Sequence, residues 1–375
     1  MTQIPVPNTS KSSQTLRVGL IGLGEVAQAV HLPTLSLVSQ LIIVVAICDI
    51  SPASLAHCSA KFHIPHCYTS AEELCFRPDV DIIFVLSSDE FHASHTITAL
   101  QNHKHVFVEK PVSLSVASAE RMRAAEIASG GRVFVAYMRR YASALQTLLS
   151  ELKTAGDIKF ARVRDIIGPN SFFVEQSGTF PERFEDFPAG AIDERKALLD
   201  ALLREAYEGH KEVTPLMTRF CRFLGGLGSH DLSVMREVLG MPKACTGVSM
   251  HPPFFTATFE YETFAVCYES GLDDVPRFDA HLQIYGQKKT LKLQYDTPYV
   301  KGLPVKVLVE EVAAGEGYQQ REIVPTYEDA YTAELKQLHE TITQGREIKT
   351  TITDAMKDLE IFQMILKKAF PLDLC

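Results

Sequence analysis

A lysine, Lys110, stands between Glu109 and Pro111 where the short apolar stretch 106–108 ends. The apolar stretch predicts a buried strand, and a charged pair followed by proline predicts that the strand stops there. In a parallel α/β sheet, ligands bind at the carboxyl ends of the strands. A partly desolvated lysine at that edge has a lowered pKa and can exchange a proton with a substrate hydroxyl. The alternative is a Glu-Lys pair on a surface turn.

A glycine pattern in residues 22–27 (Gly-Leu-Gly-Glu-Val-Ala) follows an apolar stretch and precedes a helical pattern. Gly22 permits a tight turn, Gly24 lets the backbone approach a pyrophosphate, and Ala27 allows close packing of helix against strand. The N-terminus of the helix supplies N–H donors for the phosphates. We therefore expect a dinucleotide-binding loop, with contacts from Gly22, Gly24, Glu25, Val26 and Ala27.

Asp49 follows the apolar stretch 42–48, about 25 residues after Gly24. A carboxylate at the end of the second strand hydrogen-bonds the ribose hydroxyls of the adenosine. No Lys or Arg stands between Asp49 and Lys61 to receive the 2′-phosphate of NADP. The expected cofactor is therefore NAD, and NADP is less favoured.

The polar turn Ser87, Ser88, Asp89 and His92 follows another predicted strand, 80–86, at the same edge. These side chains, together with Glu109 and Lys110, are expected to contact the nicotinamide end of the dinucleotide. Capping of the next helix by Ser88 or Asp89 is an equally good interpretation. His92 alone is more typical of a packing or capping residue.

Tyr137, Arg139 and Arg140 follow the predicted strand 132–136. Two adjacent arginines at a strand end are suited to binding a carboxylate or a phosphate on the substrate. The alternative is the solvated start of a helix.

Strands and helices alternate over residues 16–140, which predicts an α/β fold with a doubly wound parallel sheet, a Rossmann domain at 15–141. Residues 142–375 show six further strand patterns in succession and two C-terminal helical patterns, at 327–344 and 353–368. They predict an α+β domain with a large, mostly antiparallel open sheet, whose final helix packs back on the Rossmann domain. Residues 1–14 predict a disordered tail.

The less regular segment 166–222 is expected to be an insertion or lid on the substrate side. Residues 296–302 and the turn at 313–317 are further candidates for lining the pocket.

Composition excludes several classes of function. A chain of 375 residues is long enough for two domains, and its net charge of −9 without a basic block excludes a nucleic-acid surface. The longest apolar run, 41–48, is too short to span a membrane. The scattered cysteines indicate reduced thiols in the cytoplasm and no metal site; they are Cys48, Cys58, Cys67, Cys75, Cys221, Cys245, Cys267 and Cys375.

Five segments of the chain together resemble the Gfo/Idh/MocA oxidoreductases: residues 22–28, 31–33, 101–111, 138–141 and 284–291. The family signature is G-K-H-V-x-x-E-K-P. This chain matches it from Lys104 to Pro111, and Asn102 and His103 replace the usual small residue and glycine before Lys104. The resemblance implies that Lys110 lies over the nicotinamide, that its bond to Pro111 is often cis, and that the C-terminal sheet often mediates dimer or tetramer formation.

The same resemblance covers residues 223–232, where the family histidine that acts as acid or base corresponds to His230. A histidine pKa near 6.5 suits that role; capping of a helix that begins near Asp231 is the alternative. Many members carry an aspartate four residues earlier, and this chain has Gly226. A typical inositol or glucose substrate is therefore less expected.

The leading hypothesis is an NAD-dependent oxidoreductase that transfers a hydride between a secondary alcohol or ketone and nicotinamide. Sugar-like compounds rank first among the substrate classes implied by the resemblance, ahead of cyclic polyols and dihydrodiols. The alternatives are an enzyme of the same fold that uses NAD without net redox chemistry, as in epimerisation, elimination or glycoside cleavage, and a cofactor-sensing regulator.

Overall fold

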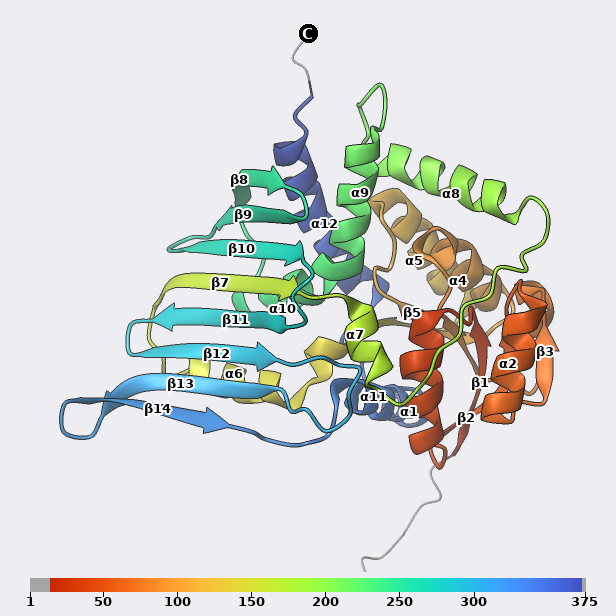
Figure 1. Ribbon diagram of the computed structural model, residues 1–375, viewed down its shortest axis with the longest axis horizontal. Helices are drawn as coiled ribbons and strands as arrows, with labels where there is room; N and C mark the ends of the chain where they lie inside the picture. The colour runs from red at the N-terminus through yellow and green to blue at the C-terminus, as the bar shows by residue number, and fades with distance from the viewer. Residues whose placement is uncertain (1–13, 373–375) are drawn as a thin grey trace, which may run out of the picture.

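Six parallel strands form the first sheet in the computed structural model, which describes residues 14–372 (Figure 1). Their order is β3-β2-β1-β4-β5-β6, so the chain reverses direction across the sheet between β1 and β4, the point at which doubly wound folds bind ligands. The strands are β1 (Leu16–Ile21), β2 (Ile42–Cys48), β3 (His66–Tyr68), β4 (Ile82–Val85), β5 (His105–Glu109) and β6 (Val133–Ala136).

The inner strands have apolar side chains on both faces because helices cover both faces. Phe84, Phe107 and Phe134 point to one face and stack in a row, with ring centroids 4.3 and 5.7 Å apart. Their valine neighbours join the core on the opposite face. The connecting helices are η1 (Ala27–His31), α1 (Leu32–Leu37), α2 (Pro52–Phe62), α3 (Ala71–Cys75), η2 (Asp89–Phe91), α4 (His92–Gln101), α5 (Val116–Ser129) and η3 (Met138–Tyr141).

The second sheet has eight strands in the order β14-β13-β12-β11-β7-β10-β9-β8, and only the β7–β10 pair is parallel. The predicted fold class, a Rossmann sheet followed by a mostly antiparallel sheet, is therefore confirmed. The strands are β7 (Ile158–Ile167), β8 (Ala244–His251), β9 (Phe254–Glu260), β10 (Ala265–Leu272), β11 (Phe278–Gly286), β12 (Lys289–Tyr295), β13 (Lys306–Ala313) and β14 (Gly317–Ile323).

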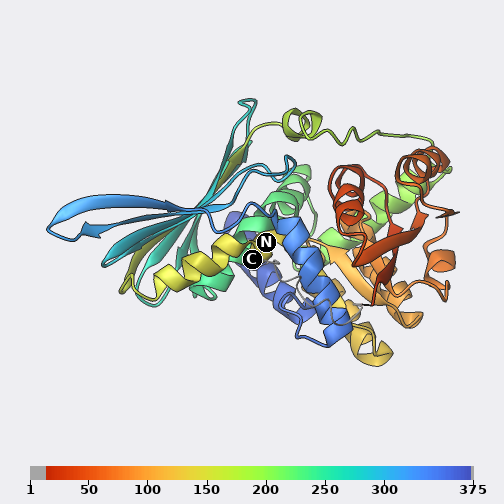
Figure 2. The same ribbon diagram turned by 90° about the horizontal axis from the view of Figure 1, so that it is seen from below.

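Helices cover one face of this sheet, and Figure 2 shows the opposite face without a helical layer. Among the helices that contact its strands are α6 (Ser143–Leu152), α10 (Ser229–Leu239) and α12 (Ile352–Ala369). The C-terminal helix α12 also contacts α5 and β6. Leu335 and Leu338 of α11 (Ala330–Gln344) belong to the core beside Phe107, so both C-terminal helices reach the Rossmann domain.

The segment 166–222 contains three helices and one extended stretch: α7 (Asn170–Glu175), α8 (Ala191–Ala206) and α9 (Pro215–Phe223). Between α7 and α8, residues 176–190, here named the strap, run from the second sheet across to α1 and α2 (Figures 1 and 2). The strap and α8 contact the Rossmann domain, and the interpretation of the segment as an insertion or lid on the substrate side stays a prediction.

Two details differ from the expectations. The strand β14 was not predicted, and the turn 313–317 joins β13 to β14 at the end of the hairpin far from the Rossmann domain (Figure 1), so it does not line the pocket. Of the predicted tail 1–14, all but Gln14 lies outside the described residues. Within residues 14–372, no helix is both long and apolar enough for a membrane span.

Candidate active site

The glycine loop follows β1 at the carboxyl edge of the first sheet. Gly22 has a φ of +95°, and a Cβ there would lie 2.7 Å from the backbone nitrogen of Ser87, so only glycine fits this turn. A Cβ at Gly24 would meet no protein atom within 4 Å, so packing within the described chain does not require glycine at this position. The open space beside Gly24 suits close approach of a ligand to the backbone.

Asp49 faces this loop from the end of β2. Its carboxylate accepts hydrogen bonds from the Leu23 N–H at 2.7 Å and from the Ser51 N–H at 2.9 Å. Burial raises the pKa of Asp49, and these two amide bonds oppose that shift. Asp49 is thus fixed beside the glycine loop, where an adenosine ribose is expected.

The turn after β4 lies against the glycine loop, but His92 does not face open space. His92 is buried, with Nδ1 2.8 Å from the Pro111 carbonyl and Nε2 2.9 Å from the Ser87 carbonyl. His92 connects the turn after β4 to the turn after β5. It therefore positions these two turns, in place of the expected contact with the cofactor. Ser88 precedes η2 without a capping bond from its side chain, and Asp89 opens that helix.

Lys110 follows β5, and its peptide bond to Pro111 is cis, as the resemblance implied. Glu109 points toward η1, where its carboxylate lies 2.7 Å from His31 Nε2 and accepts the Lys110 N–H at 3.0 Å. Burial alone raises the pKa of Glu109, but His31 and the charge of Lys110 lower it overall. Glu109 therefore anchors the turn and does not face a cofactor, contrary to expectation. Glu25 likewise pairs with Arg183 of the strap at 2.7 Å.

A continuous helical run brings His230 to Lys110. It comprises α9, the π-helical turn η4 (Leu224–Gly228) and α10, so His230 is the second residue of α10 and not a cap before it. The Lys110 Nζ donates to the Gly226 carbonyl at 2.6 Å. Lys110, Gly226 and His230 line one cavity of about 330 Å³ between the two sheets.

The surroundings of Lys110 and His230 favour the neutral forms of both side chains. Burial lowers the pKa of Lys110, although the charges of Glu109 and Asp89 oppose the shift. Burial, followed by the charges of Lys110 and Arg139, lowers the pKa of His230 well below its usual range. The buried His230 Nδ1 has no hydrogen-bond partner among the described residues. Lys110 therefore reaches its neutral, proton-accepting form more readily than a solvated lysine, and His230 favours the neutral imidazole, whose Nδ1 can accept a hydrogen bond.

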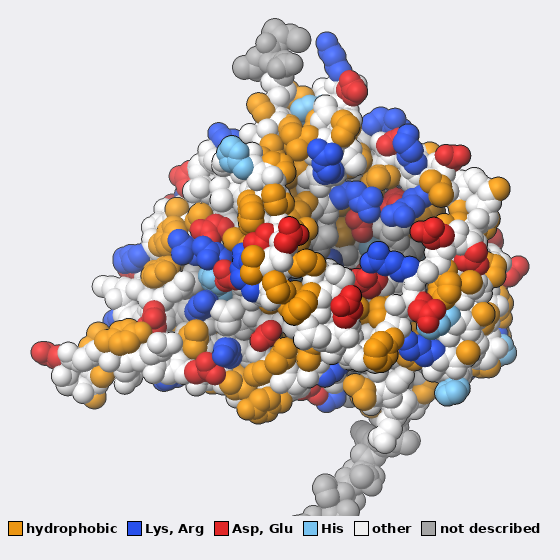
Figure 3. All heavy atoms as spheres, in the orientation of Figure 1, with side chains coloured by type: hydrophobic (Ala, Val, Ile, Leu, Met, Phe, Trp, Pro, Cys, Tyr) orange, Lys and Arg blue, Asp and Glu red, His pale blue; other side chains and the backbone are white. Residues whose placement is uncertain are grey.

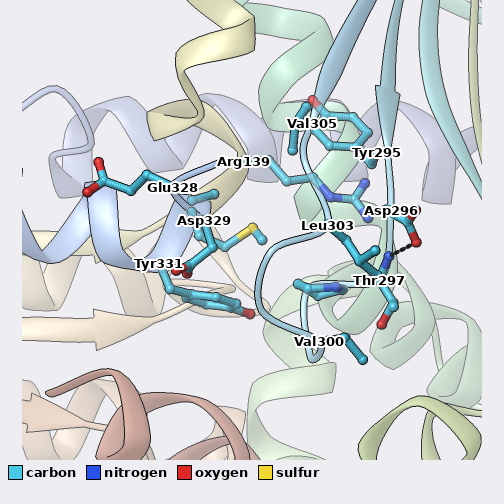
Figure 4. Close-up of a pocket in the computed structure, with 13 residues that line it drawn as sticks. Arg139, Tyr295, Asp296, Thr297, Val300, Leu303, Val305, Glu328, Asp329 and Tyr331 are labelled. Atoms are coloured by element: carbon cyan, nitrogen blue, oxygen red, sulfur yellow. Dashed lines mark hydrogen bonds between the residues drawn. The ribbon is translucent and has the colours of Figure 1, made fainter. Parts of the chain in front are cut away.

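Arg139 also lines the cavity, held by two buried carboxylates. Its Nη1 is 3.1 Å from Asp165 Oδ2 and bonds Asp231, and its guanidinium lies 4.5 Å from the centre of the Tyr295 ring. Figure 4 shows Arg139 extending toward Tyr295 and the loop that carries Asp296. Burial, then the neighbouring Asp165, raises the pKa of Asp231 well above its usual range. Arg139 is thus a fixed cation whose charge these carboxylates largely balance.

Tyr137 and Arg140, expected as substrate contacts, do not line the cavity. Arg140 is buried in a separate ion-pair network, with Nε 2.6 Å from Glu237 and a further bond to Asp354. Tyr137 is buried, and burial raises its pKa well above the usual range. The paired arginines therefore diverge, and only Arg139 reaches the site.

Several residues at the cavity were not singled out from the sequence. Asp165 of β7 and Asp231 of α10 hold Arg139 without lining the cavity themselves, and Arg222 reaches the cavity from the segment interpreted as an insertion. The one signal available for Arg222 is its spacing of four residues from Gly226 and eight from His230 on a helix. Tyr299 of the loop 296–302 lines the cavity, in the interval where a pocket residue was expected.

The strap lies over the cofactor edge. Gln28 exchanges two hydrogen bonds of 2.9 Å with the backbone of Glu182, and Lys61 Nζ donates to the carbonyl of Thr179 at 2.6 Å. Asp186 accepts a bond from the Ser51 hydroxyl and another, at 2.9 Å, from the Ala53 N–H in the first turn of α2. These two bonds lower the pKa of Asp186, so this carboxylate is negatively charged next to Asp49.

His95, whose Nδ1 lies 3.0 Å from the Ser87 hydroxyl, predicts a stability change with pH. Burial lowers its pKa from 6.5 to about 4. Below pH 6.5 the unfolded chain binds this proton more readily, so the free energy of unfolding falls as pH drops toward 4, by at most about 1.4 kcal/mol per pH unit. In His95→Gln the fall, measured by denaturant titration at several pH values, should be shallower.

The exposed His66 provides the control. His66→Gln should retain the pH dependence of the unmodified protein. Equal slopes for His95→Gln and the unmodified protein would contradict the assignment to His95.

Two parts of the chain match one protein family. Residues 16–137 match its oxidoreductase domain with an NAD-binding Rossmann fold, and residues 220–371 match its C-terminal alpha/beta domain. Inositol 2-dehydrogenase from Acidothermus cellulolyticus is 25% identical over 336 residues, which cover 89% of this chain and 87% of that protein.

Solved structures share the fold at lower identity. Levoglucosan dehydrogenase, in complex with NADH and levoglucosan, has a TM-score of 0.71 at 16% identity, covering 95% of this chain and 97% of that one. A 3-ketoreductase from Actinomadura kijaniata, in complex with TDP-benzene and NADP, has a TM-score of 0.70 at 16% identity, with coverage of 95% and 96%. The two structures hold different nicotinamide cofactors.

Proposed function

This chain belongs to the Gfo/Idh/MocA oxidoreductase family, and we propose that it transfers a hydride between a secondary alcohol or its ketone and a nicotinamide dinucleotide. The observation that carries the proposal is the meeting of Lys110 and His230 at one cavity beside the cofactor edge of the Rossmann sheet. The substrate classes proposed are sugar-like compounds, cyclic polyols and dihydrodiols.

The residues at the sheet edge fit a dinucleotide. The open space at Gly24 and the amides of the helical run after it suit a pyrophosphate, and Asp49 suits the adenosine ribose. Gly22, Val26, Ala27, Ser87, Ser88 and Asp89 complete the proposed cofactor contacts. A bound nicotinamide supplies the hydride acceptor or donor that the side chains lack.

The side chains manage the hydroxyl proton. In the oxidation direction, Lys110 in its neutral form takes the proton of the substrate hydroxyl, and the Gly226 carbonyl holds its amine at the cavity. His230 Nδ1 accepts a second hydrogen bond from the substrate or relays the proton. Apolar walls, among them Leu227 and Phe278, exclude water from the reacting group.

The proposal is tested by incubating the purified protein with NAD or NADP and a panel of secondary alcohols from the three classes. Absorbance at 340 nm should rise in proportion to product. Product formation without reduced nicotinamide would favour the alternative chemistry without net redox. Absence of any turnover, with capture of a transcription factor, would favour a regulatory role.

We further propose that the cofactor is NAD, because two carboxylates flank the first turn of α2. Asp49 lies where the ribose is expected, and Asp186 of the strap occupies the Ala53 N–H on the same turn. A 2′-phosphate placed there meets repulsion from both charges. The strap thus adds a second negative charge that disfavours NADP, beside the charge of Asp49.

Asp186→Asn is expected to tighten NADP binding about tenfold while changing the NAD dissociation constant less than about threefold. Calorimetry with each cofactor measures both constants without turnover. Glu185→Gln is the control, because Glu185 is an exposed neighbour on the same strap. An unchanged ratio of the two constants in Asp186→Asn, or an equal change in Glu185→Gln, would refute the role of Asp186.

A cytoplasmic location and a homodimer or homotetramer are also proposed. All seven cysteines among residues 14–372 are free thiols, which is typical of a reducing compartment. The face of the eight-stranded sheet without a helical layer (Figure 2) supports assembly through that face. Size-exclusion chromatography with light scattering gives the assembly state.

A further inference from the structure

The charged side chains that line the active-site cavity are basic, and none of its lining residues within 14–372 is acidic. Lys110, Arg139 and Arg222 border the cavity together with the imidazole of His230. Figure 3 shows this face of the molecule hollowed beside α9 and the strap, with Lys and Arg side chains, and some Asp and Glu side chains, around the rim of the hollow. The cavity is therefore suited to a negatively charged ligand.

The three cations differ in how much charge they leave for a ligand. Arg139 is balanced by Asp165 and Asp231, and Lys110 has a lowered pKa. Arg222 has neither a hydrogen bond nor an ion pair to any of the described residues, although it is half-buried at the cavity wall. Arg222 is the side chain whose charge remains to be matched.

Arg222 borders the same cavity as Lys110 and His230, from an earlier point on the helical run that carries His230. Arg222, Gly226 and His230 are spaced by four residues along the helical run and share one face. A substrate that reaches both side chains presents its hydroxyl at His230 and its charge at Arg222.

The rest of the wall is mainly apolar, including Ile167, Phe223, Leu227, Leu272 and Phe278. A densely hydroxylated sugar would leave hydroxyl groups without partners against these side chains. A carbon ring or short chain with one polar edge fits better, and about 330 Å³ is small for a ligand pocket.

We propose that Arg222 is a specificity residue and that the substrate is a hydroxylated ring or chain compound carrying a carboxylate, bound by the Arg222 guanidinium. The proposal rests on the oxidoreductase function above and specifies its substrate class. One planar guanidinium matches the two oxygens of a carboxylate.

Benzoate and benzamide test the charge preference, because they have similar shapes and differ in charge. Calorimetry on the cofactor-loaded protein at pH 7 should show benzoate binding at least tenfold tighter than benzamide, and Arg222→Gln should bind the two equally. Arg219→Gln, an exposed arginine one turn away on α9 that does not line the cavity, should keep the preference. Phenyl phosphate should bind no tighter than benzoate.

Equal binding of benzoate and benzamide to the unmodified protein would overturn the proposal, as would a preference that survives in Arg222→Gln. Tighter binding of phenyl phosphate would overturn the assignment to a carboxylate. These binding measurements need no turnover, so their outcome is independent of the test with the alcohol panel. A charge preference without oxidation of any alcohol refutes the oxidoreductase function alone. Oxidation of neutral alcohols without a charge preference refutes the substrate class alone.

Gly226→Asp provides a second variant if Arg222→Gln fails to fold. A Cβ at Gly226 meets no atom within 4 Å, so the position has room for a side chain. The introduced carboxylate lies between Arg222 and His230 and should abolish the preference for benzoate. Retained tenfold preference in Gly226→Asp with an unchanged melting temperature would contradict the proposal.

Discussion

Lys110→Met is expected to lower kcat about 10²- to 10⁴-fold, which is the range contributed by a positioned general acid or base. Methionine keeps much of the aliphatic chain and removes the amine that lies 2.6 Å from the Gly226 carbonyl. The dissociation constant for NAD should change less than about threefold, because the glycine loop and Asp49 hold the other end of the cofactor. Steady-state kinetics and calorimetry measure the two quantities separately.

Lys110→Arg distinguishes proton exchange from charge. Arginine keeps the cation but cannot give up its proton at neutral pH, so kcat should fall in this variant too. Lys288→Met is the control, since Lys288 is exposed on the turn after β11. Full activity of Lys110→Met would exclude Lys110 as the acid–base residue.

Arg139→Met is expected to lower the free energy of unfolding by about 3–5 kcal/mol, because it leaves the buried carboxyls of Asp165 and Asp231 without their cation. Denaturant titration measures the loss. The effect should be largest at high pH, where both carboxyls are ionised in the unfolded chain.

Asp231→Asn tests the cause of that loss. The raised pKa of Asp231 means that its carboxyl holds a proton more readily than usual, so an isosteric neutral amide should cost much less than Arg139→Met. Combined with Arg139→Met, it should recover part of the stability. A loss below about 1 kcal/mol for Arg139→Met would show that this cluster is not needed for folding.

Local patterns in the sequence predicted the cofactor edge because each of its parts is contiguous. The glycine loop, Asp49 and Lys110 each follow an apolar stretch directly, and the alternation of strands and helices places the three strand ends on one edge. His230 entered by resemblance, and the structure places it on the same cavity as Lys110. Its role, like that of Lys110, stays a prediction.

Features that depend on distant pairing were not predictable in this way. Arg139 and Arg140 are adjacent in sequence, yet they reach different networks because they meet carboxylates from β7, α10 and α12. The positions of Arg222 and Asp186 depend on the path of the segment 166–222, which carries no repeating pattern. Glu109 and His92 were expected to face the cofactor. Their partners, His31 and the Pro111 carbonyl, become neighbours only in the folded chain, so the sequence did not reveal these contacts.

The proposed oxidoreductase function is tested most directly by a single turnover with an alcohol that carries deuterium on its carbinol carbon. The panel should include ring alcohols with and without a carboxylate. One deuterium should appear in the reduced nicotinamide for each molecule of ketone formed, and Lys110→Met should slow its appearance. Conversion of the alcohol with the deuterium retained in the product, and no reduced nicotinamide, would contradict the proposed function.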